Sequence, residues 1–245
     1  MAYRDKFLSA DAADVYDSVE YSLSSVGNLL WEIEKDILRD LLKTRIHNES
    51  LRYLDFACGT GRIVSFIAPY AVNSTGIDVS AEMLARARER SPGTLFFRKD
   101  ISSEDVIEGT YDLVTSFRFL SNVDSLTRRS ALLALCARMD SSAILVINTH
   151  TNPVSYKMFF LAWHAARGIL GGNLHTRYLS TNAMRQTLSA TGFEVVETIG
   201  YGFIPGKLLR LIPWDIALGL ERFFRRIPLL STFGVNQIAV CRRSV

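Results

Sequence analysis

LDFACGTGR, at residues 54–62, is the stretch of this sequence that decides its fold class. It joins an apolar run, residues 51–56, to a turn of small residues and then to helix-compatible sequence over 63–68. A strand, a tight turn and a helix in this order direct the first amides of the helix toward a ligand. A second apolar run, residues 75–79, carries Asp78 near its end, where a carboxylate can accept both hydroxyls of a ribose. The turn and the acid together imply a cofactor that contains a nucleoside.

The spacing inside the turn distinguishes between two kinds of nucleoside cofactor. A dinucleotide site requires three glycines so that the backbone can approach a pyrophosphate. Here Asp55 precedes an alternating series of small residues, Ala57, Gly59 and Gly61. An acid at this place repels a pyrophosphate, but it suits a ligand that carries an ammonium and a sulfonium.

This pattern resembles motif I of the class I S-adenosylmethionine-dependent methyltransferases, which is commonly an acid, a spacer and three alternating glycines. Ala57 stands in place of the first glycine, which adds one methyl group near the turn. Four further segments resemble the family's second to fifth strand ends in the same order: 78–87, 97–101, 111–118 and 143–148. The resemblance covers about residues 50–150, is typical of small-molecule enzymes close to the type 11 and type 25 methyltransferase domains, and implies S-adenosylmethionine as cofactor.

The resemblance also implies which residues contact the cofactor. Asp78 would hold the ribose, Val79 and Met83 would line the adenine, and Asp100 would meet the adenine amino group. Other interpretations stay open for four of the assignments. Asp78 could end a strand and begin a turn, and Asp100 could cap a helix or turn. Met83 suits a helix core, and Tyr21 suits packing against an outer helix. The expected cofactor residues are Tyr21, Asp55, Ala57, Gly59, Gly61, Arg62, Asp78, Val79, Met83, Asp100, Ile101 and Phe117.

The alternation of strand-like and helix-like segments over 51–148 predicts a parallel sheet with helices on both faces. Right-handed crossovers bring the carboxyl ends of such strands to one edge, where open α/β sheets bind ligands. Helices are predicted at 126–139 and 181–191, and further strands at 193–199 and 237–241. The expected fold is therefore α/β, a Rossmann-like seven-stranded doubly wound sheet whose last strand is antiparallel.

Two long connections interrupt this plan, at about 149–179 and 200–236. We expect an N-terminal helical cap segment at 1–50, followed by a methyltransferase domain at 51–245 that carries these helical insertions. Connections of such length within a compact domain are usually functional.

The second insertion contains an amphipathic helical pattern over residues 215–227. Apolar residues occupy one face and charged residues the other, with only Leu218 out of place. One interpretation packs the apolar face on the core and leaves the basic face in solvent. The others are a lid over the site, pairing with another subunit in a homodimer, or peripheral membrane contact through 207–227. The apolar face comprises Ile216, Ala217, Leu220, Phe223, Phe224 and Ile227, and the polar face comprises Asp215, Gly219, Glu221, Arg222, Arg225 and Arg226.

Bulk properties restrict the partners and the compartment. A formal net charge of +3 gives no broad basic field, so no nucleic-acid partner is expected. Three widely spaced cysteines, Cys58, Cys136 and Cys241, predict reduced thiols with no zinc-binding spacing, and no metal-ligand set is present. Residues 1–10 lack a long apolar core and no uncharged run is long enough to span a membrane. We expect a cytoplasmic protein, with the peripheral membrane contact left open.

Two residues are candidates for catalysis. His150 follows the predicted fifth strand and could act as a base or contact the acceptor, and Arg118 follows the fourth strand and could bind an anionic group. The favoured function is methyl transfer to an oxygen or nitrogen of a small-molecule acceptor, namely a glycan, lipid-linked or natural-product intermediate. Oxygen is preferred because of His150.

Two alternatives stay open. A nicotinamide oxidoreductase is disfavoured by Asp55 and Ala57 and by the lack of a Tyr-x-x-x-Lys pair after the fourth strand. A non-catalytic module that binds S-adenosylmethionine or a membrane surface would have the 200–236 segment as its purpose.

Overall fold

The computed structural model describes residues 25–46, 50–100, 108–150, 152–167, 179–209 and 211–244. Tyr21 and Ile101, both expected at the cofactor, lie outside these residues. The described elements, in chain order, are α2 (Val26–Thr44), β1 (Arg52–Phe56), α3 (Arg62–Ile67), η2 (Ala68–Tyr70), β2 (Asn73–Asp78), α4 (Ala81–Arg90), β3 (Leu95–Arg98), β4 (Tyr111–Ser116), α5 (Ser125–Cys136), β5 (Met139–Thr149), α6 (Lys157–Ala166), α7 (Thr181–Ser189), β6 (Phe193–Tyr201), α8 (Gly206–Leu209), α9 (Trp214–Arg225), η4 (Pro228–Phe233) and β7 (Asn236–Arg243).

The strands form one seven-stranded sheet in the order β3-β2-β1-β4-β5-β7-β6. All neighbouring strands are parallel except β7, which is antiparallel to both β5 and β6. The predicted fold, including the antiparallel last strand, is confirmed. The order reverses direction between β1 and β4, the position at which doubly wound sheets bind ligands beyond their carboxyl ends.

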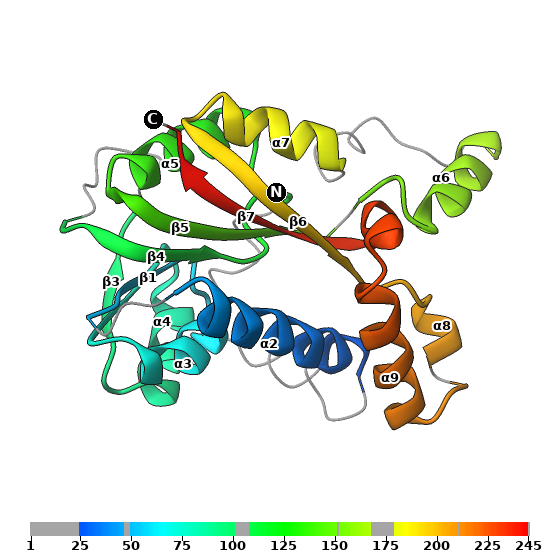
Figure 1. The fold of residues 1–245 in the computed structure, drawn as a ribbon, viewed down its shortest axis with the longest axis horizontal. Helices are drawn as coiled ribbons and strands as arrows, with labels where there is room; N and C mark the ends of the chain where they lie inside the picture. The colour runs from blue at the N-terminus through cyan, green and yellow to red at the C-terminus, as the bar shows by residue number, and fades with distance from the viewer. Residues whose placement is uncertain are drawn as a thin grey trace.

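Helices cover both faces of the sheet (Figure 1). Successive strand residues point to opposite faces, so Leu54 and Val114 lie in a cluster with α5 and α7, whereas Tyr53 and Leu113 lie in a cluster with α2, α3 and α4. Two apolar layers therefore hold the sheet between them, and the carboxyl ends of β1 and β4 are fixed from both sides.

Helix α2 belongs to the second of these layers. Its Ser25 cap accepts a hydrogen bond from the Asn28 amide, and its apolar face is buried against the sheet. The division of the chain at residue 50 stays a prediction, and the described part of that segment shares a hydrophobic cluster with the strands.

The side chains that helix α9 buries differ from those that the packing interpretation of its sequence predicts. Its buried residues are Ala217 and Glu221, whereas Ile216 and Phe223 on the apolar face are exposed. The apolar face is therefore divided, since Ala217 is buried and Phe224 and Ile227 are partly buried, whereas Ile216, Leu220 and Phe223 are exposed. The interpretation that packs the whole apolar face on the core and leaves the basic face in solvent is wrong. The physical reason is Glu221, whose carboxylate accepts hydrogen bonds from three loop amides and holds the polar face inward.

Candidate cofactor and acceptor site

The turn after β1 has the backbone shape that its small residues predict. Ala57, Gly59 and Gly61 all have positive φ, at 57°, 54° and 75°. A Cβ at Gly61 would lie 2.9 Å from the Ala87 Cβ, so this glycine lets α4 pack against the turn. A Cβ at Gly59 would meet nothing within 4 Å. The open side of the turn is therefore at Gly59, where a ligand can approach the backbone.

Asp55 lies beneath this turn and is buried. Its Oδ1 accepts a hydrogen bond from the Thr115 hydroxyl at 2.7 Å, and its Oδ2 is buried without a hydrogen-bond partner among the described residues. Because Thr115 has donated its only proton, the Tyr53 hydroxyl 2.6 Å away must be the donor to Thr115. Burial raises the pKa of Asp55 to about 7. An unsatisfied buried acceptor with this pKa fits a nearby cationic ligand, which would stabilise its ionised form.

Asp78, at the end of β2, bridges two turns with its carboxylate. Its Oδ2 accepts the Gly59 amide at 2.8 Å, and its Oδ1 accepts the Ser80 amide at 2.9 Å. Asp78 is only partly buried, and each carboxylate oxygen keeps a second lone pair. The carboxylate is therefore oriented by the protein and can still accept two ribose hydroxyls. The residues present fit a nucleoside that carries a positive charge.

The remaining expected cofactor residues divide by exposure. Val79 and Asp100 are partly buried at the ends of β2 and β3, where a ligand could reach them. Met83 and Phe117 are buried, and the Met83 amide donates to the Ser80 cap of α4. Direct cofactor contact by these residues stays a prediction.

Arg62, the first residue of α3, is held by α2. Its guanidinium carbon lies 4.5 Å from the centre of the Trp31 ring, and its Nη2 lies 3.5 Å from Oε2 of buried Glu34. Arg62 therefore ties the turn to α2, and any further contact with a cofactor stays a prediction.

Arg118 follows β4 with a φ of 63°. In the described part of the chain only Arg118 and Ala57 combine a side chain with a positive φ, and both follow the carboxyl ends of paired strands β1 and β4. The Arg118 amide donates to the Asn148 side chain at 2.5 Å, and the Arg118 carbonyl accepts a hydrogen bond from Asn122. Strain of this kind costs about 1–3 kcal/mol and is typical of functional sites.

His150 lies beside Arg118, just beyond the end of β5. Its Nδ1 is buried and has no hydrogen-bond partner in the described residues. Burial, together with the smaller effect of the positive charges of Arg118 and Lys157, lowers the pKa of His150 to about 4. Burial also lowers the pKa of Lys157. The two candidates for catalysis are thus brought together, and Lys157 of α6 adds a second positive charge near His150.

A series of buried polar side chains, which sequence reasoning missed, connects the Arg118 backbone to the turn after β1. Asn148 donates to the Tyr201 hydroxyl at 3.1 Å, and Tyr201 donates to Glu34 Oε1 at 2.7 Å. Glu34 in turn faces Arg62. The signal that could have found it is Glu34 itself, the one acid among the buried residues of α2.

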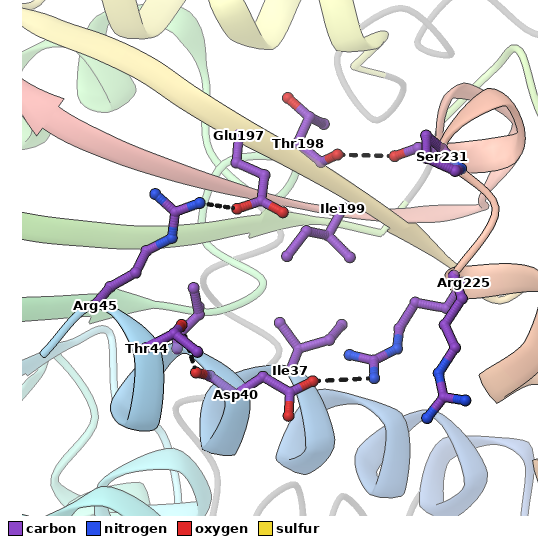
Figure 2. Close-up of a pocket in the computed structure, with 12 residues that line it drawn as sticks. Ile37, Asp40, Thr44, Arg45, Glu197, Thr198, Ile199, Arg225 and Ser231 are labelled. Carbon is purple, nitrogen blue, oxygen red and sulfur yellow. Dashed lines mark hydrogen bonds and ion pairs between the residues drawn. The ribbon is translucent and has the colours of Figure 1, made fainter.

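A separate groove of about 560 Å³ opens between α2, β6, α9 and η4 (Figure 2). Ion pairs cross it between Arg45 and Glu197 at 2.6 Å and between Arg225 and Asp40 at 3.2 Å. It contains none of the residues expected to bind cofactor or acceptor. Its lining residues are Ile37, Asp40, Leu41, Thr44, Arg45, Glu197, Thr198, Ile199, Arg225, Arg226, Pro228 and Ser231.

Further features of the described residues concern metal sites, cysteines and membrane-spanning helices. In the described ranges no group of three or more His, Cys, Asp or Glu side chains could hold a metal ion, and the three cysteines are free thiols. The helices that are described include none with the length and apolar character needed to cross a bilayer.

Comparison with known proteins agrees with the geometry. Residues 30–198 match the family described as Methyltransferase domain. The ubiquinone biosynthesis O-methyltransferase of Burkholderia thailandensis is 25% identical over 209 residues, which cover 81% of this chain and 81% of that protein. The putative methyltransferase 235L of Invertebrate iridescent virus 6 is 26% identical over 54% of this chain, and the match spans 55% of the viral protein.

Solved structures share the fold. Magnesium protoporphyrin IX methyltransferase of Synechocystis PCC 6803, with bound SAH, superposes with a TM-score of 0.67 at 16% identity. The match covers 98% of this chain and 97% of that one. The DhpI–SAH complex superposes with a TM-score of 0.62 at 16% identity, over 99% and 98% of the two chains.

Proposed function

The chain belongs to the S-adenosylmethionine-dependent methyltransferases, and on that premise we propose that it methylates an oxygen of a small molecule that carries a negative charge. The observation that carries this proposal is the Nδ1 atom of His150, which is buried without a hydrogen-bond partner among the described residues and close enough to Arg118 and Lys157 to be affected by their positive charges. Glycans, lipid-linked intermediates and natural products that bear an acidic group fit this description.

The cofactor half of the site would hold S-adenosylmethionine by the turn at residues 57–61 and by Asp78. S-adenosylmethionine, when bound, supplies a methyl group activated by the positive sulfur. The protein then has to position the acceptor oxygen close to that methyl group and exclude water. The backbone at Arg118, fixed on both sides by hydrogen bonds, and the buried side chain of His150 suit this positioning.

The acceptor half explains why a negative charge is required. The pKa of His150 near 4 keeps its imidazole neutral at physiological pH, so it can accept a proton from a hydroxyl. The imidazolium that results would be destabilised by Arg118, Lys157 and burial. An anionic group on the acceptor offsets the two cations and raises the proton affinity of His150. The bound acceptor would thus raise the basicity of His150, the residue that removes the proton from the acceptor hydroxyl.

Matched acceptors test this proposal. Transfer of labelled methyl from S-adenosylmethionine should be measured with phenols and alcohols offered in pairs, such as para-hydroxybenzoate and para-hydroxybenzamide. In each accepted pair, the compound that carries the carboxylate should be methylated on its hydroxyl, and the compound that carries the carboxamide should not. Turnover of a neutral member as fast as its anionic partner would contradict the proposal.

Variants separate the roles within the site. His150→Ala should lower kcat by about 10²–10⁴-fold while leaving SAH affinity unchanged. Lys157→Gln should raise KM for the anionic acceptor only, and exposed Arg129→Gln on α5 is the matched control that should change nothing. Full activity of His150→Ala would remove it from the mechanism. SAH binding without turnover across the whole panel would favour a non-catalytic binding module.

A further inference from the structure

We propose that the segment formed by α8, α9 and η4 docks on the surface of a lipid bilayer that contains anionic lipids. The proposal stands on the orientation of α9, independently of the acceptor chemistry. Figure 1 shows α8 and α9 together at one end of the molecule, beyond the amino-terminal end of α2.

Helix α9 presents part of its apolar face to solvent, while Ala217 on that face is buried. Ile216, Leu220 and Phe223 follow one another at intervals of one helical turn, so they share a face. Their exposed fractions are 54%, 36% and 61%. A soluble helix normally buries such a stripe, and an exposed one marks an interaction site.

The opposite face of α9 is held inward by polar contacts. The Glu221 carboxylate is fully buried and accepts the amides of Gly202, Phe203 and Ile204 at 3.0, 3.1 and 2.8 Å. Arg222 pairs with Asp36 of α2 at 2.7 Å. Rotating α9 to bury its apolar face would leave a carboxylate and three amides without partners, so the helix is fixed with that face outward.

Exposed apolar side chains also occur in the elements that flank α9 in the chain. Leu208 of α8 and Leu211 beyond it are exposed, and Leu229 and Phe233 of η4 are exposed as well. Together with the stripe on α9, they place exposed aliphatic and aromatic side chains throughout residues 208–233.

Charge selects a bilayer over a second copy of the chain. Lys207 precedes the apolar stripe and Arg226 follows it, and both are exposed. Of the two acids between them in sequence, Glu221 is buried, which leaves only Asp215 exposed. In a two-fold dimer the surface would pair with a copy of itself, in which Asp215 is the one exposed acid between the two cations in sequence, whereas anionic headgroups complement both cations. Without a described helix that could span a bilayer, the expected mode is a helix lying in the interface.

Vesicle sedimentation tests the proposal with the full chain. Vesicles of phosphatidylcholine with about 30% phosphatidylglycerol should bind the protein, and phosphatidylcholine alone should bind it much less. Ile216→Ser combined with Phe223→Ser should lower the partition coefficient by roughly tenfold or more. Lys207→Gln combined with Arg226→Gln should abolish the preference for the anionic vesicles.

The matched control is Leu126→Ser combined with Leu133→Ser on α5, where the two leucines are 77% and 46% exposed. It should bind vesicles as the unmodified protein does. Unchanged thermal unfolding and SAH affinity would show that each variant is folded. Equal vesicle binding by the α9 variant, or none by the unmodified protein, would overturn the proposal. So would light scattering that shows a dimer which the α9 variant dissociates.

Discussion

Helices α2 and α9 are joined by two ion pairs, and both have an apolar and a charged face in sequence, but they differ in the face that they turn inward. Helix α2 buries apolar side chains such as Ile33 and Ile37 against the sheet. Helix α9 instead buries Glu221 and exposes Ile216. An amphipathic pattern thus predicts that a helix has two faces, while the available partners decide which face is buried.

Leu218 was the sequence signal for the orientation of α9. It is the one apolar residue outside the apolar face, and it packs partly buried against the α2 cluster. Ala217, Glu221 and Arg225 form an inward stripe at intervals of four residues, and Leu218 borders this stripe. An apolar residue on the charged face can therefore indicate that this face is the inner one.

Substitution of one isoleucine on each helix should give the largest difference in the free energy of unfolding. Ile37→Ala on α2, where the side chain is 1% exposed, should lower the free energy of unfolding by about 2–5 kcal/mol because it leaves a cavity. Ile216→Ala on α9 should change it by less than about 0.5 kcal/mol. Urea denaturation measures both, and equal losses would mean that α9 also buries its apolar face.

The buried carboxylate of α9 should give the next largest effect. Glu221→Gln places an amide N–H₂ group where one loop amide requires an acceptor, which should cost about 1–3 kcal/mol in the free energy of unfolding. The control is Asp215→Asn in the exposed first turn of the same helix. If both variants unfold at the same urea concentration, the loop amides do not hold α9 in place.

The ion pair between the helices should give the smallest effect. A double-mutant cycle on Asp36→Asn and Arg222→Gln should give a coupling energy of about 0.5–1 kcal/mol, because Arg222 is partly exposed. Burial raises the pKa of Asp36, but Arg222, Arg39 and Arg225 together outweigh this, so the pKa lies below its usual value. The coupling should be present at neutral pH and be lost as the pH falls through this lowered pKa. A coupling that persists in strong acid would contradict the assignment.

The fold was predictable because its signals are local. Asp55, Gly59 and Gly61 lie close together in the sequence, at one turn. The strands and helices follow from apolar runs and from the turn residues that separate them. The same locality explains why Arg118 and His150 were placed together, since each follows the end of one of two neighbouring parallel strands.

The rest depended on contacts between residues far apart in the chain. Tyr201 joins Asn148 to Glu34, and no spacing in the sequence signals that these three side chains meet. The positive φ of Arg118 likewise follows from hydrogen bonds to Asn148 and Asn122, not from the identity of the residue itself. Lys157 reaches His150 from the insertion after β5, whose path the sequence did not indicate.

The most direct test of the account is calorimetric titration of SAH into the unmodified protein and into Asp78→Ala, with Asp215→Ala as the control. We expect micromolar binding by the unmodified protein and the control. The Asp78→Ala variant should bind about 5–150-fold more weakly, equivalent to about 1–3 kcal/mol. Unchanged affinity in a folded Asp78→Ala variant would contradict the placement of the nucleoside at the carboxyl ends of β1 and β2.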